Sequence, residues 1–357
     1  MARAGTTRSQ ARLTVKLIPL AGAFHTRWPA FNSVHVREAV ETFSPSVVCV
    51  PLPVGSLASP QWQGTDEVAL PLTVVPWARR AGVPLVEIGI GPDDPQDPGD
   101  AAAERDLLKF MEQYDLGRRR LAELDAAAAP LRALLSGRID HRALLASVVP
   151  AVAEYQSERE RIMDAGPGTG WLAERSALLA SRILACAGTG SDSAGQNSGR
   201  VAALIPLDYY PSVKHALVPH AEIEEIDVNS LIEPSPEARA RSLLDLAFEG
   251  GGDDPAALLP GLASLPEPEA RFHEANLLFA LGHLAEARAK LEALVAGDFS
   301  EPYYLPGFAL TRLGQLHDLA GDPRAAGRCY RGALALDFTP EAAIEFARAG
   351  LANVRET

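Results

Sequence analysis

The feature that most constrains this sequence is the alternation of short apolar runs with helical patterns in its first two-thirds. A helical spacing of apolar residues at 33–43 lies between two apolar runs, and a second helical pattern at 72–81 leads into a third. Strand–helix–strand units of this kind give parallel strands joined by right-handed crossovers. The runs that we expect to be strands are 12–20, 46–52, 84–90, 200–207 and 223–228. The sequence therefore predicts an α/β domain whose mostly parallel sheet is flanked by helices.

Between these runs, residues 101–163 are rich in helix formers and contain no apolar run typical of a strand. We interpret them as a helical insertion of two or three helices, broken near Pro130, Gly137 and Pro150. The loop 187–200 is rich in Gly, Ser and Asn and lacks apolar anchors, so we expect it to be mobile.

A change in composition at 249–255, EGGGDDP, indicates a linker. With 357 residues the chain is also long for a single core, which favours two domains. We expect the α/β domain, including its insertion, to occupy 1–248, and an all-α domain to occupy 256–357.

The helical region contains a repeated pattern. Each of two units has a Gly at a turn, an Ala five residues later and a large residue four positions after that: Gly282, Ala287 and Leu291, then Gly321, Ala326 and Tyr330. This spacing resembles the tetratricopeptide repeat, in which small residues let two antiparallel helices approach. The resemblance implies a module that binds a protein partner. Two such repeats are few for independent stability, so we expect the helical region to dock on the sheet domain or on another subunit. Docking on a second copy of the chain would give a homo-oligomer.

Composition limits the functional classes. The net charge of −13 repels phosphate backbones, so we expect no nucleic-acid partner. Three widely spaced cysteines form neither a disulfide framework nor a zinc motif, which favours a reducing cytoplasm. No apolar stretch approaches the length of about 18 residues that a membrane span requires, and Lys16 interrupts the apolar N-terminal run, which favours a strand over a signal peptide.

The first apolar run ends in a turn, Gly22-Ala23-Phe24-His25. A histidine at the carboxyl end of a strand lies at the edge where α/β proteins build their sites. There His25 could act as a general base or metal ligand, or it could be an ordinary structural residue.

The order of motifs around this turn is similar to the TraB/Tiki hydrolase superfamily, which also includes ChaN-like and erythromycin-esterase-like proteins. The opening GAFHTRWPAFNSVHVREAVETFSPSVVCVPL resembles the family's first GxxH turn, helix and strand. Residues 64–89 resemble its glutamate-bearing helix and next strand, 173–183 its Glu-Arg helix, and 201–213 the strand before its second GxxH turn.

The resemblance implies a site for hydrolysis, often dependent on a divalent metal. His25 matches the first turn, Glu67 the helix glutamate and Arg175 the Glu-Arg helix, so the resemblance makes His25 and Glu67 the candidate metal ligands. Tyr209 stands where the histidine of the second turn would be, and the neighbouring Asp208 could substitute for that histidine.

Several positions depart from the family pattern. Pro51 replaces the strand glutamate, Pro206 replaces the glycine of the second turn, and Glu87-Ile88 replaces an acidic–arginine pair. A divalent metal ordinarily needs three or four ligands. We therefore expect a divergent, non-catalytic TraB/Tiki-like domain fused to a helical-repeat interaction module. The alternative is a metal-dependent hydrolase with a cleft around His25, Glu67 and Arg175, to which Tyr209 contributes.

One acidic segment, 91–100, contains Asp93, Asp94, Asp97 and Asp100. It lacks the ligand spacing of an EF-hand, so we expect a solvated loop in preference to a calcium site.

Overall fold

The computed structural model describes residues 13–92, 94–97, 101–163, 171–186, 199–227, 233–252 and 254–356. Its contacts divide the chain into two compact units that interleave in sequence. Unit 1 is formed by 1–21, 36–57 and 75–232, and unit 2 by 22–35, 58–74 and 233–357. Most of the predicted loop 187–200 lies outside the described residues, as do Asp93 and Asp100.

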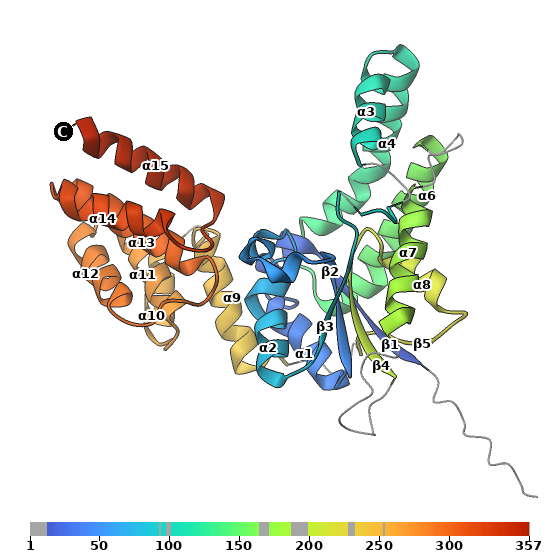
Figure 1. Ribbon diagram of the computed structural model, residues 1–357, viewed down its shortest axis with the longest axis horizontal. Coiled ribbons are helices and arrows are strands. Elements are labelled where there is room, and N and C mark those ends of the chain that lie inside the picture. Colours follow the sequence, from blue (N-terminus) through green and yellow to red (C-terminus); the bar gives the residue numbers. More distant parts are fainter. Residues whose placement is uncertain are drawn as a thin grey trace, which may run out of the picture. The chain divides into compact units, whose positions relative to one another are not determined.

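Within the described residues, unit 1 contains a five-stranded parallel sheet with the order β3-β2-β4-β1-β5 (Figure 1). The strands are β1 (Thr14–Leu20), β2 (Val47–Pro53), β3 (Leu85–Gly89), β4 (Arg200–Pro206) and β5 (Glu222–Glu224). The predicted parallel α/β sheet is confirmed, although β5 is shorter than the expected 223–228.

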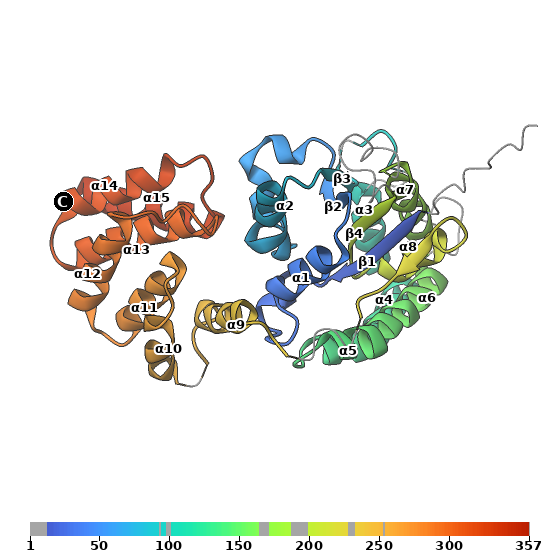
Figure 2. The ribbon, with the colours of Figure 1, turned by 90° about the horizontal axis from the view of Figure 1, so that it is seen from below.

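Helices cover both faces of this sheet (Figures 1 and 2). On one face, α7 (Trp171–Ala185) and α8 (Tyr210–Leu217) pack Leu179, Ile183 and Val213 against alternate residues of β1, β2 and β4. On the other face lie α1 (Ser33–Phe43) and α2 (Val75–Ala81). The apolar residues whose spacing predicts α1 are all buried: Val36, Ala39, Val40 and Phe43.

The predicted insertion is helical. It contains α3 (Ala101–Glu112), α4 (Asp115–Leu135), α5 (His141–Ala143), a π-helical turn (Leu144–Val148) and α6 (Val149–Met163). The break expected at Pro130 is wrong, because α4 continues through it. Proline removes one backbone donor, and the other hydrogen bonds of this 21-residue helix maintain it. The break expected at Pro150 is also wrong, because one helical run continues from the π-helical turn Leu144–Val148 into α6 and includes Pro150.

Unit 2 is helical throughout its regular structure, which confirms the predicted all-α C-terminal region. Its α-helices are α9 (Pro236–Phe248), α10 (Leu259–Ala263), α11 (Pro268–Ala280), α12 (Leu284–Val295), α13 (Leu305–Leu319), α14 (Pro323–Leu334) and α15 (Glu341–Glu356). Shorter turns are the 3-10 helices Gly22–Thr26, Pro60–Gly64 and Pro255–Leu258 and the π-helical turn Leu70–Val74; a further 3-10 turn, Ser56–Ala58, spans the boundary of the units.

Two helical hairpins, α11/α12 and α13/α14, share the predicted repeat. Each turns at a glycine with a positive φ, Gly282 at 83° and Gly321 at 74°, a conformation that favours glycine. Ala287 and Leu291 are fully buried in the first hairpin, and Ala326 and Tyr330 are buried in the second. The small and large residues of the repeat thus form the seam of each hairpin.

Unit 2 also contains a buried ionic cluster between α9, α11 and α13. Arg241 donates two 2.7 Å hydrogen bonds to the carboxylate of Glu269 and a third to Asp245. The hydroxyl of Tyr304 donates to the same glutamate, and His273 lies next to it. These contacts join α9 to the later helices, whereas the boundary predicted from the sequence, at 248, places this segment in the first domain. Three successive glycines, Gly250 to Gly252, follow α9 in the predicted linker 249–255, and each has a positive φ.

Among the described residues, no helix combines the length and the apolar character that crossing a membrane requires.

Candidate functional site

His25 lies in unit 2, in the 3-10 helix Gly22–Thr26, and its side chain is buried with 1 % exposure. Its Nδ1 is 3.0 Å from the carbonyl oxygen of Phe31, and its ring lies against Trp28 and Phe31. Burial lowers the pKa of His25 to about 4; the hydrogen bond to Phe31 acts in the opposite direction, and His35 adds to the lowering. At neutral pH His25 is therefore a neutral residue that ties the turn to the segment following it.

Glu67 contacts the same turn. Its Oε2 accepts a 3.0 Å hydrogen bond from the backbone N–H of Gly22, a residue with φ of 58°. The two predicted metal ligands thus both bind main-chain atoms within unit 2. In the part of the chain that the structure describes, no group of three or more His, Cys, Asp or Glu side chains could hold a metal ion.

Arg175 and Tyr209, the other predicted site residues, belong to unit 1. From α7, Arg175 forms a bidentate ion pair with Asp97, with distances of 2.9 Å from Nε to Oδ1 and 3.1 Å from Nη2 to Oδ2. The hydrogen bond to Asp97, together with the nearby Tyr209, raises the pKa of Arg175.

A second arginine of α7 holds the same loop. Arg182 donates to Asp94 at 2.6 Å and to the carbonyl oxygen of Gly89 at 2.7 Å. The side chains of Asp94 and Asp97 are only 9 % and 12 % exposed, so the expectation of a solvated loop is wrong for these two. The cause is an arginine pair spaced by two helical turns, which aligns with two aspartates three residues apart.

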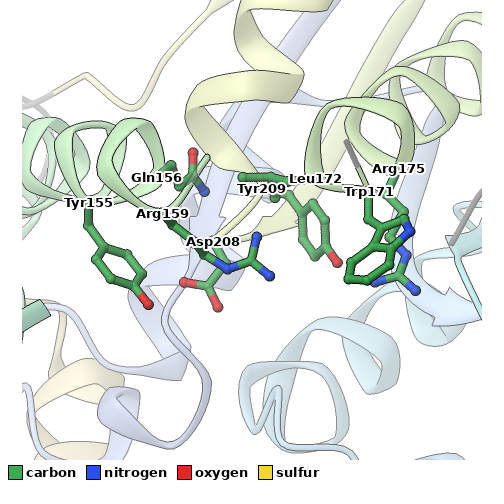
Figure 3. Close-up of a pocket in the computed structure, with 8 residues that line it drawn as sticks. All are labelled: Tyr155, Gln156, Arg159, Trp171, Leu172, Arg175, Asp208 and Tyr209. Atoms are coloured by element: carbon green, nitrogen blue, oxygen red, sulfur yellow. The ribbon is translucent and has the colours of Figure 1, made fainter. Parts of the chain in front are cut away.

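Arg175 and Tyr209 line one pocket of about 270 Å³, shown in Figure 3. The pocket lies where α6 and α7 meet the segment that follows β4. Its polar and aromatic lining consists of Tyr155, Gln156 and Arg159 from α6, Trp171 and Arg175 from α7, and Asp208 and Tyr209 after β4. Most of these side chains point into a common space.

The electrostatics of this pocket are mixed. Loss of hydration raises the pKa of Asp208, while the positive charge of Arg159 acts against that shift. Arg175 is paired with Asp97, and Figure 3 shows the charged ends of Arg159 and Asp208 side by side at the pocket. The sequence predicts Arg175, Asp208 and Tyr209 as site residues but not Arg159 or Trp171, because no motif marks the insertion that contains Arg159 or the first turn of α7 that begins with Trp171.

A second concave site lies in unit 2, along the first helices of the hairpins. This groove has a volume of about 350 Å³ and is lined by the end of α9 and by residues of α11, α13 and α15. Phe248 and Phe346 are exposed in it, at 45 % and 55 %. Asn276, Thr311, Arg312 and Gln315 are among the polar residues that line it.

Arg312 is the cation of this groove. It donates to Asn276 at 2.9 Å and to Gln315 at 2.8 Å, and its guanidinium stacks 4.4 Å from the centre of the Phe279 ring. No carboxylate among the described residues pairs with it, and burial lowers its pKa. The groove therefore presents a positive charge that no carboxylate in the described part of the chain pairs with.

Comparisons with known proteins leave the family open: no protein-family model, no curated protein and no solved structure matches the chain significantly.

Proposed function

We propose that this chain is an interaction protein whose helical hairpins bind an extended peptide carrying an acidic group. The observation that carries the proposal is Arg312, a partly buried cation with two amide partners and no carboxylate partner among the described residues. A partly desolvated guanidinium forms strong charge-assisted hydrogen bonds with a carboxylate.

The apolar part of the groove supports a peptide ligand. Phe248 and Phe346 are exposed on its surface, and large exposed aromatic side chains beside a charged group are typical of binding surfaces. A peptide with an apolar or aromatic residue next to an acidic residue or a C-terminal carboxylate would complement both features.

The sheet of unit 1 is, in this proposal, a divergent and non-catalytic TraB/Tiki-like domain. His25 is buried and bound to the Phe31 carbonyl, and Glu67 is bound to the N–H of Gly22. These contacts favour structural roles over metal binding. The alternative, a metal-dependent hydrolase, predicts a stoichiometric divalent metal in the purified protein that His25→Ala removes.

The peptide proposal is tested with the full chain and fluorescent peptides that pair an aromatic residue with an acidic one. We expect saturable binding, measured by fluorescence anisotropy, that weakens about tenfold or more in Arg312→Gln through loss of a charge-assisted hydrogen bond. Arg331→Gln is the matched control, because Arg331 is exposed on α14 and does not line the groove.

Two results would overturn the proposal. One is equal binding of the acidic peptides and their amide counterparts by both variants. The other is an absence of peptide binding together with self-association that Arg312→Gln abolishes in sedimentation experiments, which would make a second copy of the chain the occupant of the groove.

A further inference from the structure

The pocket of unit 1 contains a buried hydrogen-bond donor that lacks a partner. Gln156 is 6 % exposed, and its Oε1 accepts a 3.3 Å hydrogen bond from the hydroxyl of Ser212. Its Nε2 is buried and makes no hydrogen bond within the described part of the chain. Figure 3 shows this nitrogen turned toward the side of the pocket where Arg159 and Asp208 lie. Buried amide groups are nearly always hydrogen-bonded, so an unmatched donor on a pocket wall points to a ligand acceptor.

The neighbouring groups specify the chemistry of that acceptor. Arg159 lies on the same helix three residues after Gln156 and adds a guanidinium to the same wall. A carboxylate can accept from both, with an oxygen for each donor.

The remaining lining fits a ring. Trp171 projects into the pocket from α7, Tyr209 from the segment between β4 and α8, and Tyr155 from α6. Aromatic walls favour a flat ring by stacking or edge contacts. Among the described residues, no protein donor hydrogen-bonds to Asp208, which lies beside Arg159, so its carboxylate is open to accept from a hydroxyl or amino group on that ring.

We propose that this pocket binds a small aromatic carboxylate with a hydroxyl or amino group on its ring. Gln156 and Arg159 hold the carboxylate, the aromatic side chains hold the ring, and Asp208 accepts from the ring substituent. The site lies wholly within unit 1 and is independent of the peptide groove of unit 2. A phosphate group fits less well, because its second charge would be repelled by Asp208.

The test uses the full chain, with 4-hydroxybenzoate as the probe and calorimetry as the measurement. A ligand of this size that fills such a pocket has a Kd of about 1 mM or tighter. The neutral 4-hydroxybenzamide, which keeps the ring and hydroxyl, and inorganic phosphate are run beside it. We expect the carboxylate to bind at least about tenfold more tightly than either, the ratio that one charge-assisted hydrogen bond gives.

Variants assign the binding to the pocket. Gln156→Glu replaces the free donor with a negative charge of the same shape, and Arg159→Gln removes the cation; each is expected to weaken binding about tenfold or more. Ser157→Ala is the control, since Ser157 is exposed on the same helix and outside the pocket. Circular dichroism establishes that each variant is folded. If Gln156→Glu does not fold, Arg159→Gln, at a partly exposed position, decides the question.

The proposal is overturned if 4-hydroxybenzoate does not bind, if the amide or phosphate binds as tightly, or if the folded pocket variants bind it as the wild type does.

Discussion

The ring of Tyr330 on α14 packs directly against Gly314 on α13. A Cβ added at Gly314 would lie 2.5 Å from Cε1 of that ring, far inside van der Waals contact. The hydroxyl of Tyr330 donates a 2.6 Å hydrogen bond to Asp318 of α13, which fixes the ring in this position. The approach of the two helices therefore depends on the absence of a side chain at position 314.

Gly314→Ala should lower the free energy of unfolding by roughly 1–3 kcal/mol, the usual cost of overpacking a core. Alanine's better helix propensity would offset part of this, by about 1 kcal/mol. Urea denaturation followed by circular dichroism measures the effect. Gly332→Ala is the control: its new Cβ would be 3.5 Å from Leu310, an ordinary contact, so the variant should be no less stable than the wild type. Equal behaviour of the two variants would contradict the role of Gly314.

Arg182 should control the order of the segment after β3. It donates to the carbonyl oxygens of Ile88 and Gly89 and to Asp94, so Arg182→Gln leaves these acceptors with fewer partners. We expect faster hydrogen exchange of the amides between 88 and 97 and a loss of about 1–3 kcal/mol in stability. Glu174→Gln, an exposed change on the same helix, serves as the control. Unchanged exchange rates in Arg182→Gln would show that the loop is held by other contacts.

His25 should make the protein sensitive to acid. Its pKa of about 4 in the folded state lies below the ordinary value of 6.5, so the unfolded chain binds the proton more readily. The contribution to stability is complete above about pH 6.5 and falls as the pH is lowered toward 4, by roughly 3 kcal/mol in all.

His25→Asn tests this dependence, since its amide nitrogen can still donate to the Phe31 carbonyl but does not titrate. Carboxylates also titrate in this range, so the informative quantity is the difference between the pH dependence of the two proteins in urea denaturation. We expect the decline from pH 6.5 to 4 to be shallower in His25→Asn. Parallel curves would contradict the assignment.

Local sequence pattern predicts the sheet and its helices well. The strands are short apolar runs, and α1 follows from Val36, Ala39, Val40 and Phe43, because burial on one side of a sheet imposes such a spacing. The glycines Gly282 and Gly321 also predict the turns of the two hairpins, since a positive φ is a local requirement that glycine meets.

The arrangement of the candidate site is harder to predict from the sequence, because it depends on contacts between residues distant in sequence. The sequence predicts that His25 lies at an open sheet edge, where α/β proteins build their sites, but the turn continues as a 3-10 helix that buries the ring against Trp28 and Phe31. Arg182 and Asp94 are 88 residues apart, and nothing in either local pattern indicates their pairing. The free donor of Gln156 is visible only once α6 has packed beside α8 and the hydroxyl of Ser212 donates to its Oε1.

The buried cluster around Arg241 provides the last prediction. Burial disfavours ionised Glu269, but the charge of Arg241 and hydrogen bonds from His273 and Arg241 outweigh that effect and lower the pKa of Glu269 below its usual range. Arg241→Met would leave that carboxylate buried without its cation and should cost about 3–5 kcal/mol of stability.

The double variant Arg241→Met/Glu269→Met separates the two contributions. It removes the unpaired charge along with its partner, so it should be more stable than Arg241→Met alone, as expected when a buried ion pair is replaced by apolar groups. The remaining Asp245 can be protonated, because burial raises its pKa to about 7 despite the opposing charge of Arg241 in the wild type. Thermal or urea unfolding of the wild type, the two single variants and the double variant gives the coupling energy between Arg241 and Glu269. If the effects of the single variants simply add, the pair does not stabilise unit 2 through its charges, and α9 is held to α11 by the apolar contacts of Leu244, Ala247 and Leu277 instead.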